Sequence, residues 1–148
     1  MKVTKIIIHH SLTKDGTVND WKAIRRYHIE EKGWDDIGYH YGIENVGGKI
    51  VIQKGRAENV IGAHTLGMND KSIGICVVGN YDLTEPTEWA LKVLTVLCAG
   101  ICKRYKLKPE DIETHHKYAN YKTCPGTKFP MWKLRQMVAR KLGGGRDL

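Results

Sequence analysis

Potential metal ligands lie near both ends of this sequence. His9 and His10 close an apolar run, and His115 and His116 precede Cys124 by nine and eight residues. Imidazole and thiolate groups together favour zinc, and three protein ligands in place of four leave one coordination position for water, as in hydrolytic zinc sites. The residue types therefore predict a zinc-dependent hydrolase.

Two predicted strands position these histidines. Residues 3–8 are β-rich and almost continuously apolar, which predicts a central strand covered on both faces and ending at His9. A short segment at 111–114 leads directly into His115. Neighbouring strands deliver their terminal side chains to a common rim, so His9 and His115 can converge, with Cys124 arriving on the loop that follows.

Gly47 and Gly48 predict a tight hairpin turn. The strands expected on either side, at 40–44 and 49–53, should therefore pair antiparallel. Another buried strand is expected at 72–78. The central sheet should accordingly be mixed.

Apolar residues at helical spacing predict helices at 20–31, 87–105 and 130–142. The first should begin at a cap on Asn19 or Asp20 and stop at Gly33. The second is apolar over most of its circumference and should lie deep against the sheet. The third is basic, and its inner side should carry Trp132, Leu134, Met137 and Val138. We therefore expect an α/β fold with a mixed central β-sheet flanked by about three helices.

Length and charge narrow the possibilities further. With 148 residues, the chain has the size of one domain, expected at 1–142 with a flexible tail at 143–148. Lys and Arg total 24 against 16 Asp and Glu, and the formal charge of +8 favours polyanionic partners such as nucleic acid, an anionic cell wall or a membrane surface. The apolar run at 3–8 is too short for a signal-peptide core or a membrane span, so we expect synthesis in the cytoplasm without a signal peptide.

The other three cysteines are expected to be structural. No CxxC pair and no secretory signal accompany the cysteines, which favours reduced thiols. Cys98 and Cys102 lie one helical turn apart in an apolar stretch, where free cysteine packs as a small hydrophobe. The same interpretation applies to Cys76 in the strand at 72–78.

Six blocks of sequence resemble, in order, the motifs of the zinc-dependent N-acetylmuramoyl-L-alanine amidases, a family shared by bacteriophage endolysins of the lysozyme-amidase type and peptidoglycan recognition proteins. The blocks are IHHSLT (8–13), IRRYH (24–28), GWDDIGYH (33–40), GAH (62–64), NDKSIGI (69–75) and KTCPG (122–126). The resemblance extends over roughly residues 5 to 140. It implies a zinc groove on one face of the mixed sheet, with bacterial peptidoglycan as substrate. The bond cut would be the amide joining N-acetylmuramic acid to the first L-alanine of the stem peptide.

The resemblance also implies roles for five residues. His9, His115 and Cys124 match the ligands of one Zn²⁺ per chain, with water in the fourth position. Tyr39 matches a catalytic tyrosine that hydrogen-bonds the metal-bound water or the developing tetrahedral oxygen, and Lys122 matches a lysine whose cation stabilises that oxygen. Without the resemblance, Tyr39 would be interpreted as a half-buried strand residue and Lys122 as a solvated loop charge.

Several histidines leave alternatives open. The family often places its second histidine eight residues before the cysteine, so His116 competes with His115 for the metal. We favour His115 because the family's ligand directly follows a short strand and the next loop here has an extra residue. His10 is expected to support the site or the fold. His64 is expected at the groove wall, either touching substrate or making a structural hydrogen bond, and His28 is expected to pack on the inner side of its helix.

The first functional hypothesis is a monomeric phage-type endolysin that is made in the bacterial host cytoplasm and acts on the cell wall. The resemblance leaves two alternatives. One is a peptidoglycan-binding protein without catalysis, and the other is an amidase that also inhibits a phage RNA polymerase. No stable nucleic-acid binding and no membrane span are expected.

Overall fold

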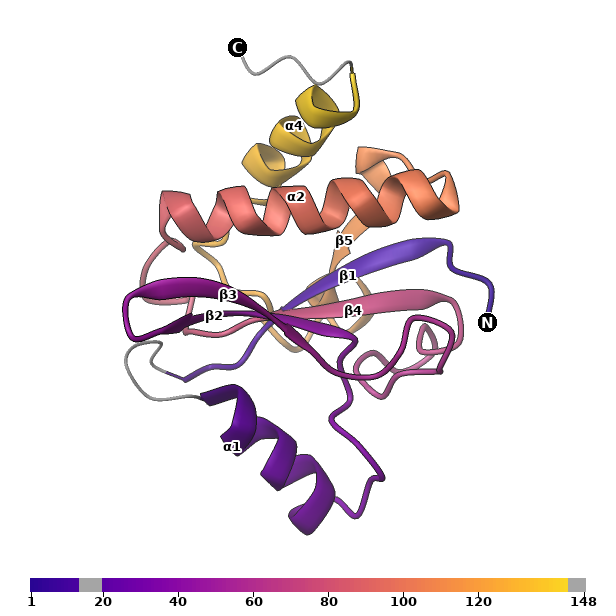
Figure 1. The fold of residues 1–148 in the computed structure, drawn as a ribbon, viewed down its shortest axis with the longest axis vertical. Helices are drawn as coiled ribbons and strands as arrows, with labels where there is room; N and C mark the ends of the chain where they lie inside the picture. The colour runs from indigo at the N-terminus through magenta and orange to yellow at the C-terminus, as the bar shows by residue number, and fades with distance from the viewer. Residues whose placement is uncertain (14–19, 144–148) are drawn as a thin grey trace.

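A computed structural model describes residues 1–13 and 20–143, and its centre is a five-stranded sheet in the order β3-β2-β4-β1-β5 (Figure 1). β1 pairs in parallel with both β4 and β5, whereas β2 pairs in parallel with β4 and antiparallel with β3. The prediction of a mixed sheet is therefore confirmed. The strands are β1 (Lys5–His10), β2 (Tyr41–Val46), β3 (Lys49–Lys54), β4 (Ser72–Val77) and β5 (Ile112–Thr114).

The β2–β3 hairpin turns at the predicted glycine pair. Gly47 and Gly48 have φ values of 60° and 87°. Two consecutive positive φ angles are typical of the type I′ turn, whose twist matches that of the flanking strands. In the strand order of the sheet, β3 lies at one edge.

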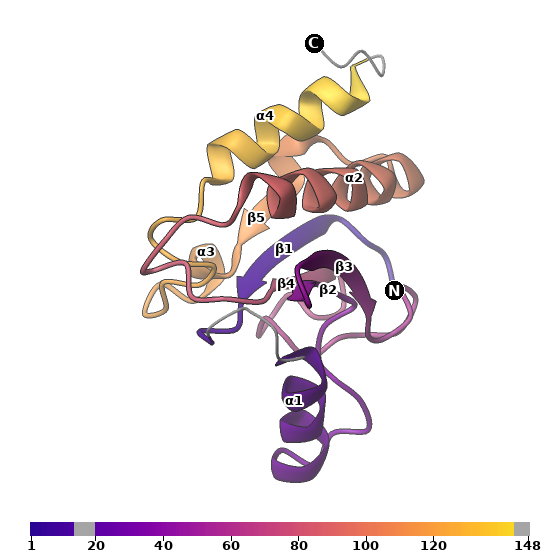
Figure 2. The same cartoon turned by 60° about the vertical axis from the view of Figure 1, so that its left-hand side comes forward.

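Helices cover both faces of the sheet. α2 and α4 lie on one side and α1 on the other (Figures 1 and 2). Thr87 caps α2 by accepting a hydrogen bond from the amide of Ala90 (3.1 Å), which matches the predicted start of that helix. The helical segments are α1 (Asp20–Arg26), the π-helical η1 (Tyr27–Glu31), α2 (Glu88–Tyr105), the 3₁₀ turn η2 (Pro109–Asp111), the one-turn α3 (His115–Tyr118) and α4 (Met131–Leu142).

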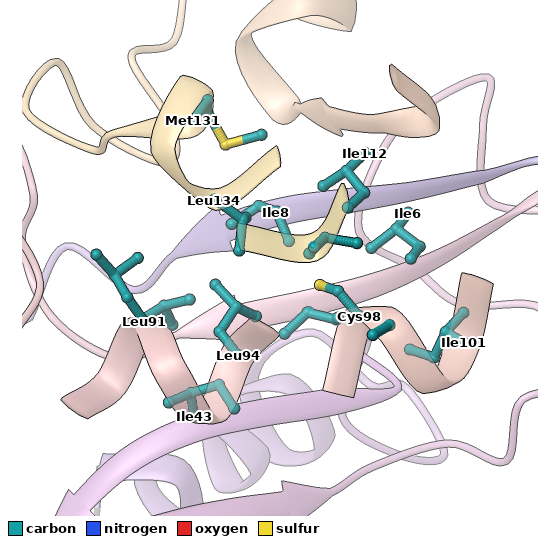
Figure 3. Close-up of a cluster of buried hydrophobic side chains, with 14 of the residues drawn as sticks. Ile6, Ile8, Ile43, Leu91, Leu94, Cys98, Ile101, Ile112, Met131 and Leu134 are labelled. Atoms are coloured by element: carbon teal, nitrogen blue, oxygen red, sulfur yellow. The ribbon is translucent and has the colours of Figure 1, made fainter. Parts of the chain in front are cut away.

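The main core lies between the sheet and the α2–α4 layer (Figure 3). Ile6, Ile7 and Ile8 of β1 are all completely buried, as expected for a central strand covered on both faces. Cys98 and Cys76 are also completely buried, and no described cysteine is in a disulfide. The structural interpretation of these cysteines is therefore confirmed.

The prediction for the inner face of α4 is wrong at one position. Met131, Leu134 and Val138 are buried, whereas the Trp132 side chain is 69% exposed. Each residue advances about 100° around a helix, and the core-facing residues of α4 are spaced three or four residues apart. Trp132 does not have this spacing, so its side chain points away from the sheet. A tryptophan thus stands on the surface of a basic helix.

Two expectations fall outside the part of the chain that the structure describes, namely the cap at Asn19 and most of the tail at 143–148. Within the described ranges, no helix is both long and apolar enough to cross a membrane.

Candidate metal centre

The two predicted strands bring their histidines to one edge of the sheet. Ile8 of β1 lies opposite Thr114 of β5, so His9 and His115 follow at the same end of the two strands. Thr114 also caps α3, because its hydroxyl accepts a hydrogen bond from the amide of Lys117 (3.0 Å). His115 is consequently the first residue of a one-turn helix near the end of β1 (Figure 2).

Hydrogen bonds hold Cys124 beside these histidines. The amide of His10 donates to the Cys124 sulfur (3.3 Å), and the amide of His116 donates to the Cys124 carbonyl oxygen (2.8 Å). On its outer side, the Asp82 carboxylate accepts hydrogen bonds from the Thr123 hydroxyl (2.8 Å) and the Thr127 amide (2.9 Å). The buried cysteine is thus fixed by contacts on both sides of its loop.

The donor atoms of His9, His115 and Cys124 fit a zinc site. One ligand atom from each residue lies within 4.8 Å of the others, and His9 Nδ1 is 3.7 Å from Cys124 Sγ. Zinc bonds of about 2.0–2.3 Å in tetrahedral geometry separate two ligand atoms by roughly 3.4–3.8 Å. A small inward movement of these side chains would therefore complete the protein part of such a site.

His116 and His10 lie outside this cluster. His116 is exposed, and its Nδ1 donates a hydrogen bond to the carbonyl oxygen of Lys122 (2.6 Å). His10 is buried, and its Nδ1 accepts a hydrogen bond from the amide of Tyr81 (3.1 Å). Among the described residues, none provides a hydrogen-bond partner for the buried Nε2 of His10. Both histidines thus stabilise the surroundings of the cluster.

A chain of hydrogen bonds sets the orientation of His9. The carbonyl oxygen of Met68 can only accept, so the Ser72 hydroxyl donates to it (2.6 Å) and can itself accept from His64 Nε2 (3.5 Å). His64 Nδ1 then carries a lone pair and can accept from His9 Nε2 (3.0 Å). The Thr65 hydroxyl lies beside both atoms, 2.9 Å from His64 Nδ1 and 3.2 Å from His9 Nε2. This leaves a lone pair on His9 Nδ1, the atom that faces Cys124. Metal-bound histidines usually have such a partner on the other ring nitrogen.

His64, predicted at the groove wall, thus lines the groove and contacts His9 as well. Sequence reasoning missed the partners that hold it. The side chain of Asn69 accepts hydrogen bonds from the amides of His64 and Thr65, both at 2.8 Å. Gly74 leaves room for the imidazole, because a Cβ there would lie 2.5 Å from the ring of His64. Asn69, Ser72 and Gly74 all belong to one block of the family resemblance, and this was the sequence signal that could have identified them.

The imidazoles are uncharged at neutral pH. Burial lowers the pKa of His9 well below its usual value and is also the main cause that lowers the pKa of His64 to about 3 and of His115 to about 4. Burial raises the pKa of the Cys124 thiol to about 12. A metal ion would therefore meet neutral imidazoles and displace one proton, that of the thiol.

Tyr39 and Lys122 both line the groove that contains the cluster. The centre of the Tyr39 ring lies 5.1 Å from that of His9. Burial, followed by the neighbouring thiols of Cys76 and Cys124, raises the pKa of Tyr39 well above its usual value, so the phenol stays protonated. The charge of Lys122 contributes to the lowered pKa values of His9 and His115, consistent with an ammonium group at the rim near both rings.

The groove that contains the cluster, called the metal groove below, has a volume of about 760 Å³ and lies between α1 and the Cys124 loop. His28, on the α1 side, is buried and accepts a hydrogen bond from the amide of Gly38 at Nδ1 (3.0 Å), which confirms its predicted packing role. The cluster therefore lies inside an open groove that is large enough for part of a polymer.

Comparisons with known proteins show what this chain is similar to. Residues 1–127 match the family described as N-acetylmuramoyl-L-alanine amidase. The chain is 34% identical over 126 residues to peptidoglycan-recognition protein SC2 of Drosophila simulans, covering 82% of this chain and 67% of the relative. It is 32% identical over 135 residues to the endolysin of Escherichia phage T7, covering 86% of this chain and 83% of the relative. A solved structure of the N-acetylmuramoyl-L-alanine amidase LysC from Clostridium intestinale superposes with a TM-score of 0.80 at 28% identity, covering 93% of this chain and 85% of LysC.

Proposed function

The chain belongs to the N-acetylmuramoyl-L-alanine amidase family, and from this premise we propose that it uses one zinc ion to hydrolyse the amide bond between N-acetylmuramic acid and L-alanine in peptidoglycan. The observation that carries the proposal is the convergence of His9, His115 and Cys124 inside an open groove. Three ligands of these types are typical of catalytic zinc sites.

His9, His115 and Cys124 would hold the zinc ion in this proposal. When bound, zinc activates water and polarises the carbonyl of the scissile amide. The chain's own contribution is orientation. The hydrogen bond from His9 Nε2 to His64 directs His9 Nδ1 toward the cluster. The His10 amide would stabilise the negative charge on the Cys124 sulfur once its proton is displaced. His116, whose ring is hydrogen-bonded to Lys122, stays outside the ligand set.

Tyr39 and Lys122 would stabilise the negative charge that develops on the amide oxygen. The raised pKa of Tyr39 keeps its phenol protonated, so the hydroxyl can donate a hydrogen bond. Lys122 supplies a positive charge at the rim of the same groove. Preorganised donors of this kind typically contribute about 10²–10³ in turnover rate.

Tyr39→Phe tests this role. The substitution removes the hydroxyl but keeps the ring, so turnover should fall by about 10²–10³ while zinc binding changes little. Measurement of zinc content and muropeptide hydrolysis on one preparation separates these effects. An unchanged rate would remove Tyr39 from the proposed mechanism.

We also propose that the protein acts as a monomeric phage-type endolysin on the cell wall. Its similarity to the T7 endolysin, over most of both chains, supports this setting. An additional polymerase-inhibiting activity stays a prediction. A pull-down with the phage's own polymerase would test it.

A peptidoglycan-binding protein without catalysis is the second candidate function. The 34% identity to a peptidoglycan-recognition protein favours it. The presence of all three potential ligands together with Tyr39 favours the amidase instead. Both candidates predict binding to peptidoglycan, so only product formation separates them.

Digestion of purified peptidoglycan followed by mass analysis of the products tests the proposed bond. The expected products are free stem peptides that begin with L-alanine, and they should disappear in Cys124→Ser protein. New reducing sugar ends would identify a glycosidase. Binding to peptidoglycan without any released product would support the non-catalytic alternative.

A further inference from the structure

Helices α2 and α4 lie on the side of the sheet opposite α1 (Figure 2). Residues of both helices line a second groove. It has a volume of about 550 Å³. Four cationic side chains line it, one from α2 and three from α4. They are Lys92, Lys133, Arg140 and Lys141.

The groove carries an excess of positive charge. Glu88 is the one carboxylate among its lining residues, and it forms an ion pair with Lys133 at 2.7 Å. With Lys92, Arg140 and Lys141, the lining has four cations against this one carboxylate. Cations gathered along a concave surface focus their field and attract anions.

Two exposed tryptophans accompany these cations. Trp89 is 61% exposed, and the Lys92 ammonium lies 5.6 Å from the centre of one of its rings. Trp132 is 69% exposed and precedes Gln136, a lining residue, by one helical turn. Aromatic faces beside cations add packing surface for the carbon backbone of a polyanionic ligand.

We propose that the α2–α4 groove binds a linear polymer with repeating phosphodiester groups, of the kind attached to bacterial envelopes. A groove lined by cations from two helices accommodates a chain, whereas the surface of a lipid bilayer is flat. The choice of an envelope polymer over a nucleic acid rests on the proposed function at the cell wall. Binding itself requires neither zinc nor amide hydrolysis.

The fold allows both grooves to be occupied together. The sheet separates the α2–α4 groove from α1, which forms one wall of the metal groove (Figures 1 and 2). An enzyme held by one polymer meets nearby peptidoglycan at a raised effective concentration. The second groove would therefore increase action on intact walls without changing the chemistry.

Binding of poly(glycerol phosphate) to the full chain tests the proposal. Lys92→Gln/Arg140→Gln removes two charges from the groove. The matched control, Lys49→Gln/Lys54→Gln, removes two charges from exposed positions on β3. Because the groove variant loses two surface ion pairs, its affinity for the polymer should fall about five- to tenfold, whereas the affinity of the control should change less than twofold. The salt dependence should also become shallower in the groove variant alone.

Further arms of the experiment identify the ligand. The proposal predicts weaker binding to a single-stranded DNA with the same number of phosphates and to phosphatidylglycerol vesicles. Tighter binding to either would overturn the choice of polymer, and equal losses in the two double variants would overturn the groove itself. Hydrolysis of a soluble muropeptide by the groove variant should equal that of the wild type, which separates this test from a failure of the proposed function.

Discussion

The two grooves of this protein are of comparable size but are built in opposite ways. The metal groove, of about 760 Å³, contains neutral buried imidazoles joined by hydrogen bonds. The α2–α4 groove, of about 550 Å³, is lined by long charged side chains, including the exposed Lys92 and Arg140. The first is suited to hold a small ion with fixed geometry, and the second to attract a charged chain without fixed geometry.

This difference separates short-range from long-range effects. In the metal groove, moving one proposed ligand atom by an ångström should impair the function, because metal bonds have narrow length limits. In the α2–α4 groove, individual contacts are weak and screened by salt, so only their sum matters. Substitutions in the two regions should therefore differ in both size and salt dependence.

The largest effect is expected for Cys124→Ser. A neutral hydroxyl replaces the thiolate, so zinc affinity should fall by more than the 10–100-fold typical of changes around a metal site, and hydrolysis should be lost. Cys98→Ala is the matched control, because Cys98 lies buried in the main core. The Cys98→Ala protein should keep zinc but be less stable, which zinc analysis and thermal unfolding would measure. Retention of zinc by Cys124→Ser would exclude the cysteine as a ligand.

His115 and His116 offer a sharper comparison between neighbours. His115→Ala should lose zinc, because the ligand atom of His115 belongs to the cluster. His116→Ala should keep zinc within a few-fold, since it loses only the hydrogen bond to the Lys122 carbonyl. Zinc content after dialysis decides the outcome. The reverse result would move the ligand to His116 and leave the proposed reaction unchanged.

An intermediate effect is expected for His64→Phe. Phenylalanine keeps a ring at this position but cannot accept the hydrogen bond from His9 Nε2. The Thr65 hydroxyl, 3.2 Å from His9 Nε2, stays available, so zinc affinity should fall toward the lower end of the range of about 10–100-fold. Ser72→Ala removes the longer 3.5 Å contact to His64 and should have a smaller effect. Competition with a chelator measures both affinities. Equal affinity in His64→Phe and the wild type would show that His64 does not orient the ligand.

Much of the fold could be predicted from local sequence patterns, but most of the contacts that hold the site residues could not. The apolar run at 3–8 and the turn at Gly47 and Gly48 determined their elements, because burial and positive φ angles act locally. The His9–His64 contact joins residues 55 positions apart and depends on the strand order, which periodicity does not determine. Trp132 lies outside the predicted inner face of the last helix, because its angular position on the helix, not its apolar character, decides its exposure.

The smallest effect concerns salt. Lysis of whole cells should fall as salt rises, because exposed charges are screened over about 10 Å at 0.1 M ionic strength. Hydrolysis of a small soluble muropeptide should fall much less, since it depends on short-range contacts in the metal groove. Rates for both substrates across one salt series provide the comparison. Equal sensitivity would show that the basic surface does not direct the protein to the wall.

The central claim is that zinc in the His9, His115 and Cys124 cluster is required for amide hydrolysis. Its most direct test is a titration of zinc into metal-free protein while release of stem peptide from a soluble muropeptide is followed. Activity should rise in proportion to bound zinc and reach its maximum at one ion per chain. Full activity in protein whose metal content is measured as zero would contradict the account.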